Sequence, residues 1–205
     1  MNNKITSLKE KFRVALTSTA KVISEDFTLK NGKLENSNNY EIDDIKNPND
    51  FIRMRADTDS EALKKKFSNN LIHKKNLPSN STLRVLYDIA EKVRCESLGG
   101  QMLKGIEKNF NKNYSLMINL KKKDQLKTKE DVPVAEAFEL YMLKNFHQIK
   151  LNPLTSKMLG FWEKTFEKSI ERHKKFLQEN LEDQDNYSSR FTKIFEEMDI
   201  FQTEE

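Results

Sequence analysis

The sequence predicts a mainly α-helical, compact multi-helix domain with one small β-hairpin near its N-terminus. Apolar residues recur at three- and four-residue spacing along most of the chain, which is the pattern of amphipathic helices. Pro48 and Pro153 stand where two such patterns begin, and proline is favoured in the first turn of a helix. We expect one domain over residues 1–205, with a helix and the hairpin in 5–45 and a helical body in 49–201.

The N-terminal segment predicts a helix that ends near residue 24 and is followed by the hairpin. Ser7 and Glu10 have the spacing of a capping box, which would start the helix at Ser7. The stretch FTLKNGKLE places Asn31-Gly32 between two short alternating runs, and this pair favours the positive φ angles of a tight hairpin turn. A polar connector would then lead to the helical body.

The helical body is predicted from the same periodicity. Breaks are expected around Pro78 and in the charged stretch 121–131. The expected helices are 50–67, one from Ser81 through the glycine-rich stretch, one from Pro133 to about Phe146, a long one from Pro153 to about Leu177, and a short one over 187–201.

Composition excludes several classes of protein. Hydrophobic residues make up 36% and charged residues 33%, with a mean hydropathy of −0.80, yet 13 Phe and 5 Tyr can build a core. No apolar run reaches the roughly 18 residues that span a bilayer, and the first residues lack the apolar core of a signal peptide. Cys95 is the only cysteine, which suits a reducing compartment. We expect a cytoplasmic protein with no membrane partner.

Charge is unevenly distributed along the chain. Residues 51–130 hold 18 basic and 9 acidic side chains, whereas residues 131–205 hold 10 basic and 15 acidic ones. The lysine runs 64–66, 74–75 and 121–123 keep open an alternative function, a basic helical nucleic-acid-binding module. Aromatic residues are not interleaved with these runs, and a solvated lysine-rich surface is the favoured explanation, so we do not expect a nucleic-acid partner.

The stretch RCESLGGQMLKG places three glycines within seven positions of a predicted helix, each costing about 1 kcal/mol relative to alanine. The apolar face changes side at Gly99-Gly100. Either the helix bends or breaks there, or it is central and buried on both sides. One mixed stripe continues through the change, and it suits close contact with another helix or chain. This stripe contains Glu91, Arg94, Leu98, Met102, Gly105 and Asn109.

Two members of this stripe invite specific hypotheses. Glu91 and Arg94 can pair at i,i+3 spacing, either at an interface or as an internal ion pair between helices. Gly105 would let a neighbouring backbone approach closely. The plain alternative is a glycine-hinged helix with ordinary surface charges.

The segment LYDIAEKVRCESLGGQMLKGIEKNF resembles the signature of the N-terminal region of the T subunit of aerobic cobaltochelatase, the CobT family. Arg53, Ala56 and Asp57 resemble an upstream element of that family, and the segments around Pro78 and after Pro133 are also similar to it. The residues that carry the signature are Asp88, Glu91, Arg94, Glu96, Leu98, Gly99, Met102, Gly105 and Asn109.

The resemblance implies a role in aerobic cobalamin (vitamin B12) biosynthesis. The family's enzyme is an ATP-dependent cobalt–nitrogen ligase that inserts cobalt into hydrogenobyrinic acid a,c-diamide. It implies two partners, an AAA+ S subunit and a large corrin-binding N subunit, in an oligomeric complex that uses ATP, Mg²⁺ and cobalt. The family's von Willebrand A-type domain is not in this chain, and we expect an acidic linker and that domain beyond Glu205.

Reaction chemistry is not apparent in the residues. The sequence has no phosphate-binding loop motif, and His73, His147 and His173 lie far apart without metal-ligand spacing, although a site built from two of them stays open. Cys95 is read as a small buried residue. Glu91 and Glu96 project about 140° apart on a helix, so they cannot act together on one substrate. We therefore expect no catalytic, cofactor or metal site here, and a non-catalytic assembly or adaptor domain.

Overall fold

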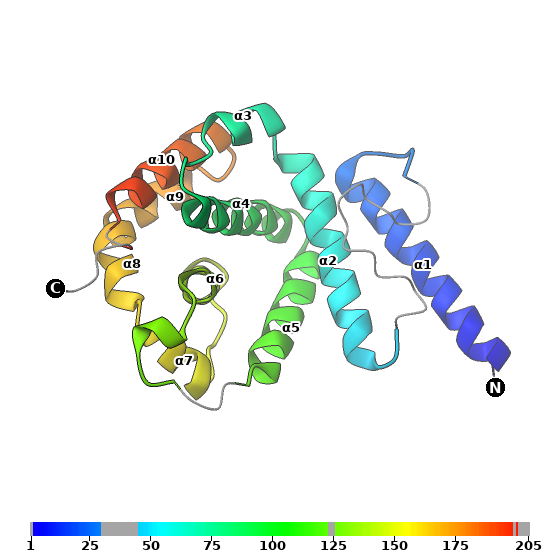
Figure 1. Cartoon of the computed structure of the whole chain (residues 1–205). Coiled ribbons are helices and arrows are strands. Elements are labelled where there is room, and N and C mark those ends of the chain that lie inside the picture. Colours follow the sequence, from blue (N-terminus) through cyan, green and yellow to red (C-terminus); the bar gives the residue numbers. More distant parts are fainter. Residues whose placement is uncertain (1, 30–44, 123–125, 199, 201–205) are drawn as a thin grey trace.

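The computed structural model describes residues 2–29, 45–122, 126–198 and 200, and the side chains from residue 8 onward. Within these residues the chain is helical and contains no β-strand. Helix α4 lies at the centre, with α2, α5, α6 and α10 arranged around it, and α1 lies at the outer side of α2 (Figure 1). The mainly helical prediction is confirmed.

The N-terminal helix α1 (Asn2–Ser24) packs along α2 (Pro48–Phe67). Phe12 and Phe51 meet edge to face with their ring centroids 4.8 Å apart, beside a small separate apolar cluster. That cluster consists of Leu16, Ile45 and Met54. Helix α1 packs mainly on α2, and its buried residues Ala20 and Ile23 also belong to the main core.

Two predictions for the N-terminal segment need correction. Helix α1 begins at Asn2, so Ser7 lies inside it and does not cap it. Residues 27–29 do not form a strand, and the Asn31-Gly32 turn with the second arm lies outside the described residues, so the hairpin is not supported.

Helix α2 starts where the sequence favoured a start. The Asn47 side chain accepts from the backbone N–H groups of Asn49 and Asp50, and the Asp50 side chain accepts from the N–H of Asn47 in return. The short helix α3 (Asn70–Lys75), capped by Asn69, was not predicted, because six residues are too few to show a period.

Helix α4 (Ser81–Met102) contains the glycine pair without a break. The chain turns instead at Leu103, whose φ of −141° is extended and whose N–H donates to the carbonyl of Gly99 at 2.9 Å. Helix α5 (Lys104–Leu120) begins directly afterwards. Of the two alternatives, the central helix buried on both sides is correct, and the break lies three residues later than the glycine pair.

The C-terminal half folds around the other side of α4. Helix α6 (Val134–Phe146) follows the 3₁₀ turn η2 (Lys129–Asp131). The predicted long helix is divided into α7 (Pro153–Gly160), α8 (Glu163–Ile170), the 3₁₀ turn η3 (Glu171–His173) and α9 (Lys174–Glu179), and α10 (Gln184–Glu197) completes the described fold.

The first of these breaks has a visible cause. Trp162 leaves the helical path between α7 and α8, and its indole Nε1 donates to the carbonyl of Val132 at 3.0 Å. The apolar stripe of Phe166, Ile170 and Leu177 is still buried, because each short helix turns the same face inward. Periodicity predicted the buried face correctly but not the bends.

Aromatic side chains fill the core between α6, α8 and α10. The Phe138 ring lies edge to face with three neighbours at centroid distances of 5.4 to 6.4 Å, an arrangement that aromatic pairs prefer. These neighbours are Phe166, Phe191 and Phe195.

Along the described part of the chain, no helix has the length and apolar character to cross a membrane.

Candidate functional site

Gly99 is the glycine at which the central helix requires the absence of a side chain. A Cβ atom at this position would lie 2.4 Å from Leu63 Cδ1, closer than real Cβ contacts. Leu63 is fully buried in α2, so it has little space to move away. The glycine therefore lets α2 lie directly against α4.

The other two glycines of the stretch have different surroundings. A Cβ atom at Gly100 would lie 3.4 Å from Glu107 Cβ, which is at most a slightly tight contact across the turn into α5. Gly105 is exposed, and a Cβ atom there would meet nothing within 4 Å. The prediction that Gly105 admits a neighbouring backbone is wrong for the described part of this chain.

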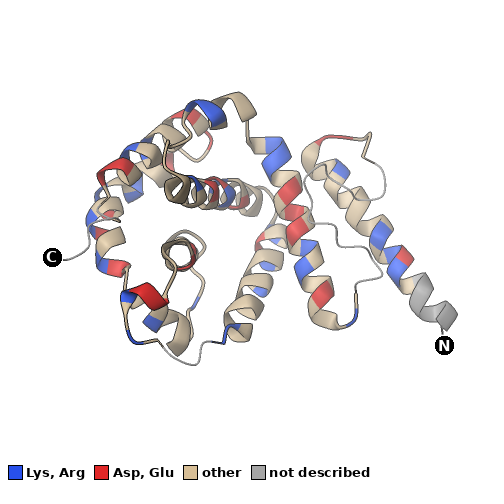
Figure 2. Ribbon diagram, in the orientation of Figure 1, with Lys and Arg blue, Asp and Glu red and all other residues tan. Residues whose placement is uncertain are grey.

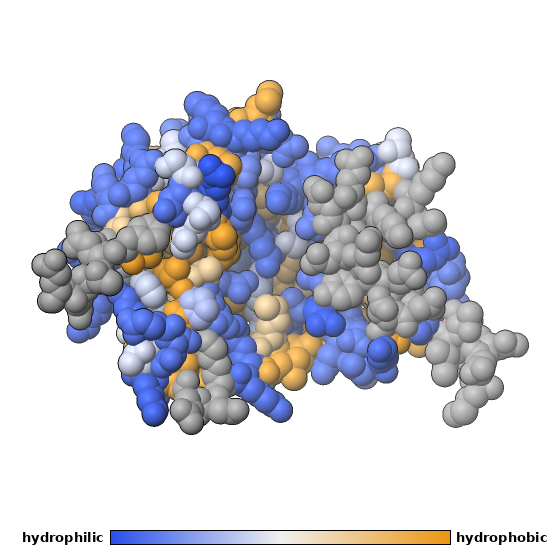
Figure 3. Space-filling model, in the orientation of Figure 1, coloured by the Kyte–Doolittle hydropathy of each residue, from blue (hydrophilic) through white to orange (hydrophobic). Residues whose placement is uncertain are grey.

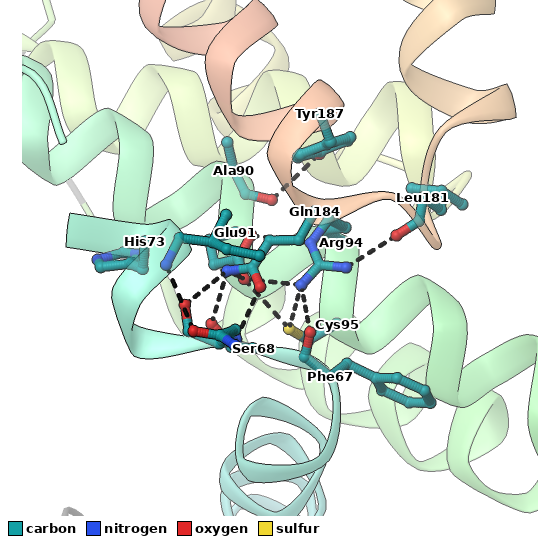
Figure 4. Close-up of polar contacts among 12 residues, drawn as sticks. Phe67, Ser68, His73, Ala90, Glu91, Arg94, Cys95, Leu181, Gln184 and Tyr187 are labelled. Atoms are coloured by element: carbon teal, nitrogen blue, oxygen red, sulfur yellow. Dashed lines mark hydrogen bonds and ion pairs between the residues drawn. The ribbon is translucent and has the colours of Figure 1, made fainter. Parts of the chain in front are cut away.

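Glu91 and Arg94 form a buried ion pair inside the fold. Arg94 Nε donates to Glu91 Oε2 and Nη2 donates to Oε1, both at 2.8 Å, and the two residues are 1% and 2% exposed. Arg94 also donates to the carbonyls of Leu181 at 2.8 Å and Phe67 at 2.7 Å. The guanidinium group thus joins α4 to the end of α2 and to the loop before α10 (Figure 4).

Gln184 completes this polar network. Its Nε2 donates to Glu91 Oε1 at 3.0 Å, and its Oε1 accepts from the backbone N–H of Asn69 at 2.7 Å. Tyr187, which lies in α10 like Gln184, donates its hydroxyl hydrogen to the carbonyl of Ala90 in α4 at 3.1 Å. Glu91 and Arg94 are almost fully buried and hydrogen-bonded to three segments of the fold, so the structure shows an internal ion pair.

Cys95 borders the network and is inert. Its Sγ lies 3.8 Å from Glu91 Oε1 and 3.7 Å from Arg94 Nη2, and the residue is 1% exposed. Burial, with Glu91 adding to it, raises the pKa of the Cys95 thiol to about 12. The prediction of a small buried residue is confirmed.

Glu96 is the centre of a second polar cluster, between α2, α4, α5 and the end of α6. It accepts hydrogen bonds from Ser60 Oγ at 2.7 Å and from the Tyr114 hydroxyl at 2.5 Å, and His147 Nε2 lies 3.5 Å from Oε2. Burial disfavours the charged form, but Lys92, His147 and the Ser60 hydrogen bond outweigh it and lower the pKa of Glu96.

The groups around Glu96 are held in fixed roles. Burial and the neighbouring Glu96 raise the pKa of Tyr114 well above its usual value, so this hydroxyl keeps its proton and acts as a donor. Lys92 Nζ lies 5.5 Å from the Tyr114 ring centroid and 3.9 Å from Glu139 Oε1. These contacts around Glu96 fix α2, α4, α5 and α6 relative to one another.

Asn109, the last residue of the signature, joins α5 to α2. Its Nδ2 donates to Asp59 Oδ2 at 2.9 Å, and Arg55 Nε lies 3.3 Å from the same oxygen. Asp59 is fully buried, its Oδ1 has no hydrogen-bond partner among the described residues, and burial raises the pKa of this carboxyl. Asn109 is therefore a structural residue.

The structure divides the predicted site residues into two groups. Glu91, Arg94, Glu96, Leu98 and Gly99 are buried, and Asn109 is half-buried against α2. Met102 is 42% exposed, and with exposed Gly105 and the 46% exposed Leu103 it forms the turn between α4 and α5. We call residues 102–105 the α4–α5 corner.

The sequence reading missed the partners of the signature residues. Ser60 and Asp59 lie in a predicted helix, where polar residues are usually solvated. Their position between apolar residues of α2 was the only sign that they face the interior. Nothing in the sequence pattern marked Gln184.

The histidines are not brought together. His73 Nε2 lies 3.1 Å from Asp88 Oδ1, whereas His147 faces Glu96 and His173 faces Arg172. Within the described ranges no three His, Cys, Asp or Glu side chains are grouped as a metal site.

Several lysines of the basic runs pair with carboxylates of the same chain. Lys65 pairs with Asp26, Lys66 with Glu25, and Lys75 Nζ lies 2.7 Å from Asp185 Oδ2. Basic and acidic residues occur together on most of the helices in view (Figure 2). The surface in the same view is largely hydrophilic, with apolar atoms in separate groups (Figure 3).

Comparison with known families gives one result that covers nearly the whole chain. A family model described as cobalamin biosynthesis protein CobT matches residues 6–205. Neither the curated proteins nor the solved structures gave a match.

Proposed function

Because this chain belongs to the CobT family of cobalamin biosynthesis proteins, we propose that it is the assembly domain of a T subunit of aerobic cobaltochelatase. Family membership makes it part of a multi-subunit cobaltochelatase. The complex would use ATP, Mg²⁺ and cobalt to insert the metal into hydrogenobyrinic acid a,c-diamide. This chain would contact the AAA+ S subunit and the large N subunit and contribute no catalytic group.

One observation supports the adaptor role most directly. The signature residues at the α4–α5 corner, Met102 and Gly105, are exposed, whereas most of the other signature residues are buried within the fold. The buried signature residues each have a partner in this chain, such as Leu63 for Gly99 and Asp59 for Asn109. Met102 and Leu103 instead expose apolar side chains at the end of a rigid central helix. Exposed apolar side chains next to an exposed glycine, as at Met102, Leu103 and Gly105, are suited to contact with a partner surface.

The corner is proposed to contact the AAA+ S subunit. No atom of the described residues lies within 4 Å of the Gly105 Cβ position, so Gly105→Leu should leave the fold intact while filling space that a partner would occupy. Gly160, at the end of α7, is exposed and equally open, which makes Gly160→Leu a matched control.

The experiment measures binding of the purified chain to the S subunit in the presence of ATP by calorimetry. We expect Gly105→Leu to weaken binding about tenfold or more, with an unchanged melting temperature, and Gly160→Leu to bind as the unchanged chain does. Equal binding by both variants would remove the corner from the interface. Failure of the unchanged chain to bind the S subunit would refute the adaptor role itself.

A further inference from the structure

His173 lies between two guanidinium groups where η3 meets α10. Arg172 Nε donates to His173 Nε2 at 3.0 Å, and Arg190 Nη1 lies 3.3 Å from His173 Nδ1. The imidazole is half-buried. Both of its ring nitrogens therefore face N–H donors.

No protonation state of the imidazole satisfies both contacts. A neutral imidazole has one N–H and one lone pair, and an imidazolium has two N–H groups. If Nε2 accepts from Arg172, then Nδ1 carries a hydrogen that faces the Arg190 N–H. At least one donor in this cluster therefore has no acceptor on the imidazole.

Arg190 forms no ion pair with a carboxylate among the described residues. Its guanidinium carbon lies 4.3 Å from the Phe176 ring centroid. Arg172 Nη2 does pair with Glu197 Oε2 at 2.9 Å, but both side chains are more than 60% exposed, so water screens this pair.

We propose that Arg172, His173 and Arg190 form a binding site for an oxyanion, a carboxylate or a phosphate group. The planar guanidinium fork matches the oxygens of such groups, and an anion would supply the acceptor that the imidazole does not. The site lies on η3 and α10 and uses none of the residues of the α4–α5 corner, so it is independent of the proposed function.

The pKa of His173 can be used to detect an anion bound at this site. Burial, Arg172 and Arg190 lower the pKa of His173 from its usual value of 6.5, with Glu197 acting in the opposite direction. An anion bound between the cations stabilises the imidazolium form, so binding raises this pKa. The chain has only three histidines, and His73 and His147 serve as internal references in the same spectrum.

The test is a proton NMR titration of the three imidazole rings, with His173→Gln to assign the resonance. We expect inorganic phosphate to raise the pKa of His173 saturably by about half a unit or more beyond sodium chloride at equal ionic strength. His73 and His147 should not follow. Acetate replaces phosphate in a parallel arm, and the anion that saturates at lower concentration identifies the source of the oxyanion.

Arg190→Gln should abolish the saturable rise and keep the melting temperature within a few degrees. Arg84→Gln is the matched control, because Arg84 Nε donates only to the carbonyl of Pro78 in the described contacts. A rise no larger than with chloride, or one that persists in Arg190→Gln, would overturn the proposal.

Discussion

Gly99 and Gly105 belong to the same signature but have opposite surroundings. Leu63 fills the space beside Gly99, whereas no atom in the described part of the chain lies within 4 Å of the Cβ position of Gly105. The sequence shows that glycine is present at both, and only the packing of α2 distinguishes them. The first is needed for close helix packing, and the second is not needed for the fold.

Gly99→Ala should lower the free energy of unfolding by about 1–3 kcal/mol, because the methyl group overlaps the buried Leu63 side chain. Gly105→Ala should be neutral or stabilising by about 0.4–1 kcal/mol, since it removes freedom from the unfolded chain. Urea denaturation measures both. Equal effects at the two positions would show that α2 does not pack closely on Gly99.

Arg94→Ala should be among the most destabilising single changes, at about 3–5 kcal/mol. It leaves the Glu91 carboxylate buried without its cation and leaves the carbonyls of Phe67 and Leu181 without their donor. Arg84→Ala, on the exposed face of the same helix, provides the comparison. A loss no larger than that of the comparison would mean that the pair is solvated.

At the scale of helices, the starts near Pro48 and Ser81 were predicted correctly, whereas the Ser7 capping box and the bends were not. The starts of α2 and α4 follow Asn47 and Asn80, whose side chains accept from the first turn. The predicted long helix failed because the Trp162 side chain is directed toward Val132, a contact thirty residues away in the chain that no periodicity contains. The buried Glu91–Arg94 pair was one of two alternatives, since spacing allows the pair but does not show what covers it.

The packing of α2, α5 and α6 around Glu96 should give stability a defined pH dependence. The pKa of Glu96 is lowered from 4.5 in the fold, so its contribution is present above that value and is lost as pH falls through the lowered pKa. Glu96→Gln should be less stable than the unchanged chain at pH 7 and should lose less stability on acidification.

Thermal unfolding between about pH 7 and pH 3 measures this difference. Glu107→Gln, an exposed position on α5, should keep the acid slope of the unchanged chain. If Glu96→Gln keeps the same slope as that control, the cluster does not hold Glu96 ionised.

At the scale of the whole molecule, the uneven charge of the sequence is partly balanced within the fold. The basic end of α2 meets Glu25 and Asp26, and Lys75 of α3 meets Asp185 of α10. Of these contacts, the one between Lys75 and Asp185 joins the basic segment 51–130 to the acidic segment 131–205. The signature likewise serves two purposes, with its buried residues fixing α4 in the centre and the α4–α5 corner left for a partner.

Hydrogen–deuterium exchange with and without the S subunit tests this division most directly. We predict that backbone amides of residues 102–108 exchange more slowly in the complex, while those of residues 91–98 exchange at the same rate in both states, because the fold already protects them. Protection elsewhere on the chain, with the corner unchanged, would contradict the account.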